Sequence, residues 1–209
     1  MEMQKELSII IVHYKTPELL RLCLNTIRET IHELSYEIIV VDSACSRLAR
    51  DIVRNFMQEQ PSVLYLPFEY NTGFSGGVNE GIRRASGQYY LILNPDVLPT
   101  NGAIENMLSY IKLHPDVGLL GPKLQYFNGD WQQSYFRFYR PFTILGRRTP
   151  LGKLQFFKKV LDSFHMNETD RTKIQTPDWI LGAVMLTSRK AVEKVGLMDQ
   201  RFFLYFEDV

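Results

Sequence analysis

The fold is decided by residues 7–18, which read Leu-Ser-Ile-Ile-Ile-Val-His-Tyr-Lys-Thr-Pro-Glu. Residues 7–12 form a short apolar run rich in β-branched side chains, which is typical of a buried strand. Thr16, Pro17 and Glu18 then supply a helix cap, a first-turn proline and a first-turn acid. The apolar residues that follow recur at helical spacing: Leu19, Leu20, Cys23, Leu24, Ile27 and Ile31. The stretch therefore predicts a strand followed by a helix that packs on a sheet.

The same alternation continues along the chain. We expect further strands at 37–41, 63–66, 88–93 and 118–120, and helices at 48–57, 75–85, 102–114 and 188–195. Strands that are apolar on both faces and alternate with helices indicate an α/β fold, with a mostly parallel central sheet flanked by helices.

The alternation disappears between residues 125 and 175, where aromatic and basic residues replace it. We expect this segment to be loop, irregular helix or a mobile segment. Because 209 residues without an internal repeat fit one large domain, we expect a single domain over residues 1–209.

Composition and charge indicate which partners and which cellular compartment to expect. With 24 basic against 23 acidic residues the formal net charge is +1, which gives no whole-molecule attraction to nucleic acid. No apolar run approaches the ~20 residues of a membrane span, and the first residues lack a secretory signal pattern. We therefore expect a cytoplasmic protein whose two cysteines, Cys23 and Cys45, are reduced thiols.

Polar residues follow the predicted strands, where ligands of open parallel sheets bind. The first strand leads to Tyr14, the second to Asp42, the third to residues 71–74 and the fourth to Asn94-Pro95-Asp96. Asp42 alone is equally compatible with an approach to a helix cap. Asn94 and Asp96 place two oxygen-bearing side chains on a turn stiffened by proline, which suits Mg2+ or Mn2+ held together with phosphate oxygens.

Three nucleotide-binding classes lack their motifs. No Gly-x-Gly-x-x-Gly opens the first helix, as a dehydrogenase requires, and no Gly-Lys-Ser/Thr follows any strand, as a P-loop kinase requires. The glycine-rich basic loop of a sugar nucleotidyltransferase is also missing after the first strand.

Six segments together resemble family 2 glycosyltransferases of the GT-A fold, and most closely their rhamnosyltransferase-like branch. They are residues 7–14, 40–43 (Val-Val-Asp-Ser), 71–81 (Asn-Thr-Gly-Phe-Ser-Gly-Gly-Val-Asn-Glu-Gly), 93–97 (Leu-Asn-Pro-Asp-Val), 179–183 (Trp-Ile-Leu-Gly-Ala) and 203–208 (Phe-Leu-Tyr-Phe-Glu-Asp). The match runs in order along nearly the whole chain.

The resemblance implies roles for the residues around the nucleotide. Asp42 would contact the nucleobase, with Tyr14 and Thr16 beside the nucleotide. Asn71, Gly73 and Phe74 would lie near its ribose and diphosphate. Ser43 stands where the family usually has Asn.

The resemblance also implies a metal site, a sugar pocket and a base. Asp96 would occupy the last position of the family's Asp-x-Asp metal motif, in which Asn94 takes the first position and removes one formal charge. Trp179 and Gly182 would line the sugar pocket, and Asp208 would be the catalytic base. Since only Val209 follows Asp208, we expect the catalytic domain to be truncated at its C-terminus.

The implied activity is an inverting, metal-dependent hexosyl transfer that uses Mn2+ or Mg2+. The donor would be a dTDP- or UDP-sugar, dTDP-rhamnose among them, and the acceptor a hydroxyl of a saccharide or lipid-linked glycan in bacterial surface-polysaccharide synthesis. A non-catalytic nucleotide-sugar-binding fragment and a sugar-nucleotide pyrophosphorylase remain alternatives.

Residues 137–173 hold nine basic residues against three acidic ones, interleaved with aromatic side chains. Basic residues beside aromatics suit an anionic interface. We therefore expect residues 136–173 to face the acceptor or to contact the inner membrane surface peripherally, although a solvated loop fits the charge pattern equally well.

Overall fold

The computed structural model describes residues 5–60 and 62–202. These residues divide into two compact units, of which the first comprises residues up to 122 together with 182–202, and the second comprises residues 123–181. The single-domain organisation stays a prediction.

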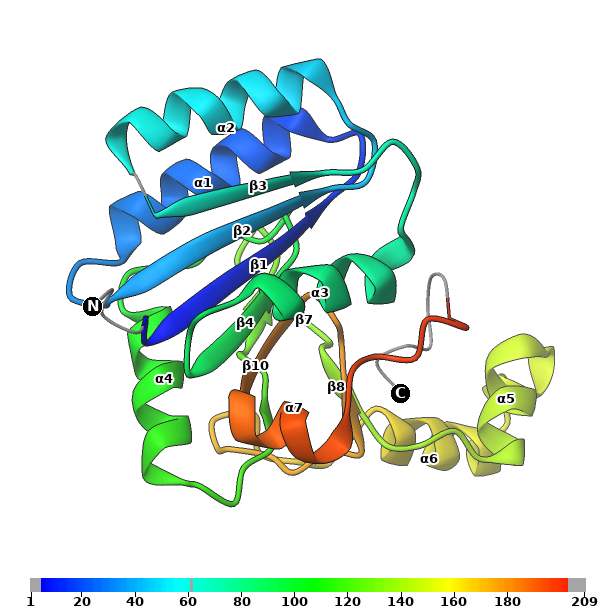
Figure 1. Cartoon of the computed structure of the whole chain (residues 1–209). Helices are drawn as coiled ribbons and strands as arrows, with labels where there is room; N and C mark the ends of the chain where they lie inside the picture. The colour runs from blue at the N-terminus through cyan, green and yellow to red at the C-terminus, as the bar shows by residue number, and fades with distance from the viewer. Residues whose placement is uncertain (1–4, 61, 203–209) are drawn as a thin grey trace. The chain divides into compact units, whose positions relative to one another are not determined.

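The first unit is built on a six-stranded sheet in the order β3-β2-β1-β4-β10-β5 (Figure 1). Its strands are β1 (Leu7–His13), β2 (Tyr36–Asp42), β3 (Val63–Pro67), β4 (Tyr89–Leu93), β5 (Leu119–Leu120) and β10 (Val184–Ser188). Strands β1 to β4 are parallel, whereas β10 runs antiparallel to both of its neighbours. The prediction of a mostly parallel α/β sheet is confirmed.

The helices of this unit connect the strands as expected. They are α1 (Pro17–Thr30), α2 (Arg47–Glu59), α3 (Gly73–Arg84), α4 (Ala103–Leu113) and α7 (Arg189–Val195). Helices α1 and α2 lie together on one face of the sheet and α3 covers the other (Figure 1). The buried core consists mainly of the apolar strand residues and the inward faces of α1 and α2.

Glycines allow α3 to approach β1 closely. A Cβ atom added at Gly81 would lie 2.3 Å from Cγ2 of Ile10, and one at Gly77 would lie 2.7 Å from Cγ1 of Val12. Ile10 is fully buried, and β-branched side chains have little freedom at χ1. The helix therefore cannot carry a side chain at residue 81 without moving away from the sheet.

Overpacking a core costs about 1–3 kcal/mol, and the 2.3 Å approach to Ile10 favours the upper part of that range. Alanine returns ~1 kcal/mol in a helix interior, so we expect Gly81→Ala to lower the free energy of unfolding by about 1–2 kcal/mol. Urea unfolding followed by circular dichroism measures the change. Gly118→Ala is the control, because a Cβ atom there would meet nothing within 4 Å. Equal stability of the two variants would contradict this account of the α3–β1 packing.

The second unit contains more regular structure than the sequence predicts. It has two short antiparallel pairs, β6 (Leu124–Gln125) with β7 (Trp131–Gln132) and β8 (Tyr135–Phe136) with β9 (Trp179–Ile180). Between them lie α5 (Pro141–Arg148), the 3-10 helix η1 (Pro150–Lys153) and α6 (Gln155–Phe164). The sequence does not indicate these helices as regular elements, because they are short and basic residues interrupt their apolar spacing, which hides the helical period.

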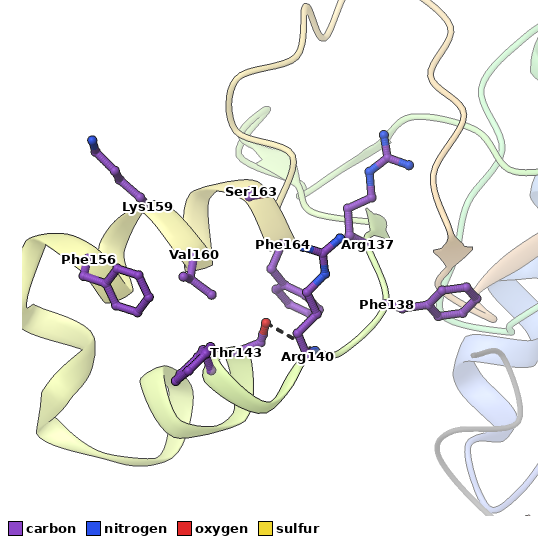
Figure 2. Close-up of a pocket in the computed structure, with 10 residues that line it drawn as sticks. Arg137, Phe138, Arg140, Thr143, Phe156, Lys159, Val160, Ser163 and Phe164 are labelled. Carbon is purple, nitrogen blue, oxygen red and sulfur yellow. Dashed lines mark hydrogen bonds between the residues drawn. The ribbon is translucent and has the colours of Figure 1, made fainter.

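Helices α5 and α6 pack closely as a hairpin, with side chains directed from one helix toward the other (Figure 2). A Cβ atom added at Gly146 of α5 would lie 3.3 Å from the ring of Phe157, and one at Gly152 would lie 2.3 Å from the Gly146 carbonyl oxygen. The absence of a side chain at Gly146 and Gly152 therefore allows the two helices to pack closely.

Candidate active site

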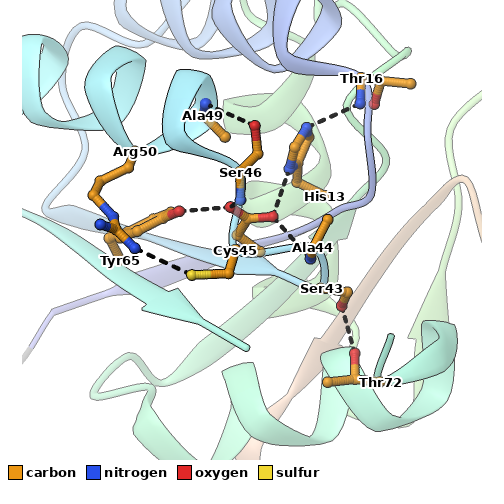
Figure 3. A network of polar contacts seen from close by, with 11 residues as sticks. His13, Thr16, Ser43, Ala44, Cys45, Ser46, Ala49, Arg50, Tyr65 and Thr72 are labelled. Carbon is orange, nitrogen blue, oxygen red and sulfur yellow. Dashed lines mark hydrogen bonds and ion pairs between the residues drawn. The ribbon is translucent and has the colours of Figure 1, made fainter. Parts of the chain in front are cut away.

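The carboxyl ends of β1 and β2 meet in a buried polar cluster (Figure 3). The register of the two strands places His13 directly opposite Asp42, and both side chains are fully buried. Asp42 Oδ1 accepts hydrogen bonds from His13 Nδ1 at 3.0 Å and from the Ala44 N–H at 3.1 Å. Asp42 Oδ2 accepts from the Ser46 N–H at 2.8 Å and from the Tyr65 hydroxyl at 2.5 Å. Each oxygen of this carboxylate therefore accepts two hydrogen bonds.

The contacts of His13 fix its tautomer. The Thr16 N–H donates to Nε2 of His13 at 3.0 Å, so Nε2 must be the unprotonated nitrogen and Nδ1–H the donor to Asp42. The imidazole is therefore neutral and joins the loop after β1 to the end of β2.

Burial and hydrogen bonding act in opposite directions on Asp42. Burial raises the pKa of Asp42, but the hydrogen bonds from His13, Tyr65 and Ala44 outweigh it, and the pKa is lowered overall. Burial and the hydrogen bond to Asp42 raise the pKa of Tyr65. Asp42 thus stays ionised while the Tyr65 hydroxyl keeps its proton and donates.

Asp42 lies just before α2 and accepts a hydrogen bond from the N–H of Ser46, the N-cap residue of that helix. These contacts agree with the interpretation of Asp42 as a residue that caps the approach to a helix. Its role at the nucleobase stays a prediction, and such a contact would require one of the four internal hydrogen bonds to be given up.

The loops after β2 and β3 are also tied together. Ser43 Oγ lies 2.5 Å from Thr72 Oγ1, and Asn71 Oδ1 accepts from the Gly73 N–H at 3.0 Å. Gly73 has a φ of 68°, in the left-handed region that glycine tolerates without strain. It begins α3 at this edge, where exposed Asn71 and half-buried Phe74 flank it.

The turn after β4 reaches the same edge, because β4 is parallel to and adjacent to β1. The Val97 N–H donates to the Asn94 carbonyl at 3.1 Å, and the Asn94 N–H donates to the carbonyl of Ala183, next to Gly182, at 2.9 Å. Asp96 is exposed. Burial raises the pKa of Cys23 in α1 to about 12, and the negative charge of Asp96 acts in the same direction.

The donor set at this turn fits a divalent cation that arrives with phosphate. Across residues 5–60 and 62–202, no three His, Cys, Asp or Glu side chains come together around a metal position. Asp96 offers one carboxylate and Asn94 a neutral amide oxygen. Mg2+ is commonly held by one or two carboxylates together with substrate phosphates, so these two side chains suit a substrate-linked metal rather than a cage of protein ligands.

The structure thus gathers most of the predicted residues in the first unit: Tyr14, Thr16, Asp42, Asn71, Gly73, Phe74, Asn94, Asp96 and Gly182. Trp179 belongs to the second unit, where its ring stacks on Phe136 at a centroid distance of 4.4 Å and its Nε1–H donates to the Arg137 carbonyl at 3.0 Å. Asp208 lies outside the described residues.

Two buried polar residues of α3 were missed as functional candidates. Asn79 donates to the Met198 carbonyl at 2.8 Å and accepts from its N–H at 3.0 Å. Ser75 donates to the Phe202 carbonyl at 2.7 Å. Each side chain is 1% exposed. In the sequence, the indication would have been two polar residues on one face of α3, where apolar residues are expected. The hydrogen bonds of Ser75 and Asn79 hold residues 198–202 against α3.

The sheet order, the one strand, β10, that runs antiparallel to both of its neighbours, and the loop edge define a GT-A glycosyltransferase fold. The structure is similar to the mannosyltransferase PcManGT from Pyrobaculum calidifontis in complex with GDP-Man and Mn2+, with a TM-score of 0.61, 18% identity and coverage of 95% of this chain and 49% of that one. It is also similar to S. aureus TarS 1-349, with a TM-score of 0.63, 14% identity and coverage of 97% and 52%.

Residues 8–168 match the family model described as Glycosyl transferase family 2, and the chain belongs to this family. It is 26% identical over 167 residues to the N-acetylglucosaminyl-diphospho-decaprenol L-rhamnosyltransferase of Mycobacterium tuberculosis (strain CDC 1551 / Oshkosh), a match that covers 73% of this chain and 53% of that protein. The chain spans about half the length of the curated relatives it matches. The predictions of the family and of the fold are confirmed.

Proposed function

We propose that this chain binds a nucleotide-diphosphate sugar at the carboxyl edge of β1–β4 and transfers the sugar to an acceptor hydroxyl with inversion. The observation that carries the proposal is the linkage of the loops after β1, β2 and β3 by the Asp42 cluster and the Ser43–Thr72 contact. Such a linkage fixes three ligand-facing loops before the donor arrives, which lowers the entropic cost of binding.

Each part of the donor has a chemically suitable neighbour at this edge. The Tyr14 side chain is 44% exposed, and its ring, with the Lys15 ammonium 5.0 Å from the centroid, offers a stacking surface for the nucleobase or ribose. The N-terminus of α3 at Gly73 supplies backbone N–H groups to the diphosphate. Asn71 and Phe74 flank that position.

Asp96, with Asn94 beside it, would hold Mn2+ or Mg2+, which when bound neutralises charge developing on the leaving diphosphate. Asp208 would take the proton of the attacking hydroxyl. Trp179 and Gly182 would contact the sugar.

A similar protein supports a proposal for the acceptor class. The rhamnosyltransferase of Mycobacterium tuberculosis is named for a sugar attached through a diphosphate to decaprenol. By analogy we propose a lipid-linked or saccharide acceptor in cell-surface polysaccharide synthesis, and a dTDP- or UDP-hexose as donor.

A donor panel tests the proposal. Calorimetry with UDP-, dTDP- and GDP-sugars, each with and without Mn2+, identifies the donor, and release of the nucleoside diphosphate in the presence of acceptor identifies transfer. Donor binding without turnover would instead support a non-catalytic fragment. Release of pyrophosphate from a nucleoside triphosphate and a sugar phosphate would support a pyrophosphorylase.

We expect Asp96→Ala to lower the Mn2+-dependent part of the donor affinity by roughly tenfold or more, since even indirect partners of metal ligands are worth 10–100-fold. Calorimetry with and without Mn2+ separates this part from the rest. Asp116→Ala is the matched control, because Asp116 is also exposed but follows α4, away from the strand ends. Unchanged Mn2+ stimulation in Asp96→Ala would remove Asp96 from the metal site.

A further inference from the structure

The hairpin of residues 137–164, which includes α5, η1 and α6, differs in charge from the rest of the chain. It contains seven basic residues and one acidic residue, Asp162, whereas the remainder holds 17 basic against 22 acidic residues. All seven basic side chains are exposed: Arg137, Arg140, Arg147, Arg148, Lys153, Lys158 and Lys159. The hairpin therefore has an excess of positive charge, whereas the remainder of the chain has an excess of negative charge.

The same hairpin exposes large apolar side chains. Those more than 40% exposed are Phe138, Phe142, Ile144, Leu145, Leu151, Leu154 and Phe156. Two of them are in contact, since the rings of Phe142 and Phe156 lie 5.7 Å apart, centroid to centroid, and the half-buried Phe157 joins them at 6.3 Å from Phe142. Scattered exposed apolar residues are ordinary, but a contiguous group marks an interaction site.

A cavity of about 390 Å³ opens between the two helices. Its lining combines aromatic and aliphatic side chains, among them Phe142, Phe156 and Val160, with the cations Arg140 and Lys159, and it includes no acidic residue. In Figure 2, Phe156 and Val160 extend from α6 toward α5. The cavity is an apolar recess bordered by positive charge.

Internal contacts hold this surface in shape. The Arg147 guanidinium lies over the rings of Tyr139 and Phe164, at 5.5 and 5.4 Å from their centroids. Arg137 pairs with Asp178 at 3.2 Å. The exposed apolar groups therefore belong to a packed hairpin, with Phe164 buried within it.

We propose that this hairpin docks on the surface of a membrane that contains anionic lipids, with its exposed aromatic and leucine side chains entering the interface and an acyl chain occupying the cavity. A bilayer surface supplies both an apolar phase and negative phosphates, as the hairpin requires. A small anion would leave the apolar side chains in water, and a second copy of the hairpin would oppose seven positive charges with seven. In the part of the chain that the structure describes, no helix is long and apolar enough to cross a membrane.

The inference stands independently of the proposed transfer reaction, because it uses neither the donor edge nor a catalytic group. Its experiment also reads a different quantity. The full chain is sedimented with vesicles of phosphatidylcholine alone and of phosphatidylcholine mixed with phosphatidylglycerol, at low and high salt. We expect partitioning onto the anionic vesicles to be at least roughly tenfold stronger at low salt and to weaken with salt.

Two pairs of variants separate charge from apolar insertion. Lys153→Gln with Lys159→Gln should lower binding to anionic vesicles by roughly tenfold or more, whereas Lys190→Gln with Lys194→Gln, a charge-matched pair on α7, should not. Phe156→Ser should weaken binding, whereas Phe127→Ser, at a side chain that is 92% exposed outside the hairpin, should leave it unchanged.

Equal partitioning onto neutral and anionic vesicles, or equal loss in both lysine pairs, would overturn the proposal. Salt-insensitive binding of the native chain would overturn it without any variant. Binding of a DNA oligonucleotide with no vesicle binding, or self-association through the hairpin in place of vesicle binding, would assign the surface to another partner.

Discussion

Asp42→Ala is expected to lower the free energy of unfolding by about 3–5 kcal/mol, the range seen when one partner is removed from a buried charged network. The change leaves four donors without an acceptor: the buried His13 Nδ1–H and three part-buried groups, the Tyr65 hydroxyl and the N–H groups of Ala44 and Ser46. Each unsatisfied buried group costs about 1–3 kcal/mol, partly relieved by relaxation or entry of water.

Asp42→Asn gives a sharper test, because it keeps the shape and removes only the charge and one acceptor. Its NH2 group must face two donors on one side of the cluster, either His13 with Ala44 or Tyr65 with Ser46. We expect a loss of about 2 kcal/mol, between Asp42→Ala and Tyr65→Phe, which removes a single donor. Asp51→Asn on the exposed surface of α2 is the matched control. Urea unfolding in which Asp42→Asn is as stable as wild type would show that the cluster does not depend on an ionised carboxylate.

The same cluster gives stability a predictable dependence on pH. The folded-state pKa of Asp42 is lowered, so its carboxylate stabilises the folded protein above the ordinary value of ~3.9. That contribution is lost as the pH falls through the lowered folded-state value. The difference in stability between wild type and Asp42→Asn should therefore be full near neutral pH and shrink only below about pH 4.

The sequence could predict that polar residues gather at the carboxyl ends of the strands, but it could not predict which of them contact each other. Strands buried on both faces must be apolar, so the polar residues at positions 13, 42 and 94 reveal where the strands end, and parallel strands bring those ends to one edge. The pairing of His13 with Asp42 depends on the register between two strands, and Tyr65 reaches the same carboxylate from a third. An alternating hydrophobic pattern can specify register, but β1 and β2 are buried on both faces and have no such alternation.

Contacts between residues far apart in the sequence could not be predicted either. Asn79 and its partner Met198 are 119 positions apart, and nothing local to either residue indicates the other. In the second unit, α5 and α6 are short and their apolar positions are interrupted by arginine and lysine, so periodicity alone could not separate helix from loop.

The contact between Asn79 and Met198 bears on the proposed base. Asn79 and Ser75 hold residues 198–202 against α3, the helix whose first residue lies at the proposed donor edge. Asp208 follows Phe202 by six positions in the sequence and lies outside the described residues. Its role as the general base stays a prediction, which mutagenesis can test.

Asp208→Asn is expected to reduce the rate of sugar transfer by about 10²–10⁴-fold, the usual contribution of a general base. Direct displacement with inversion requires a carboxylate that takes the acceptor proton on the face opposite the leaving diphosphate. The donor is proposed to bind at the β1–β4 edge, so the donor affinity should stay nearly unchanged. Transfer kinetics and calorimetry on the same variant separate the two effects.

Glu207→Gln is the matched control, because it removes the neighbouring carboxylate and should retain most of the transfer rate. A structural role for Asp208 would lower donor affinity or stability together with the rate. A base leaves a different signature, since wild-type kcat falls as the pH drops through the pKa of the carboxylate in the complex, and this acid limb is absent from the residual activity of Asp208→Asn. Full transfer by Asp208→Asn would place the base elsewhere. Loss in Glu207→Gln alone would assign the role to Glu207, because inversion needs only one carboxylate on that face.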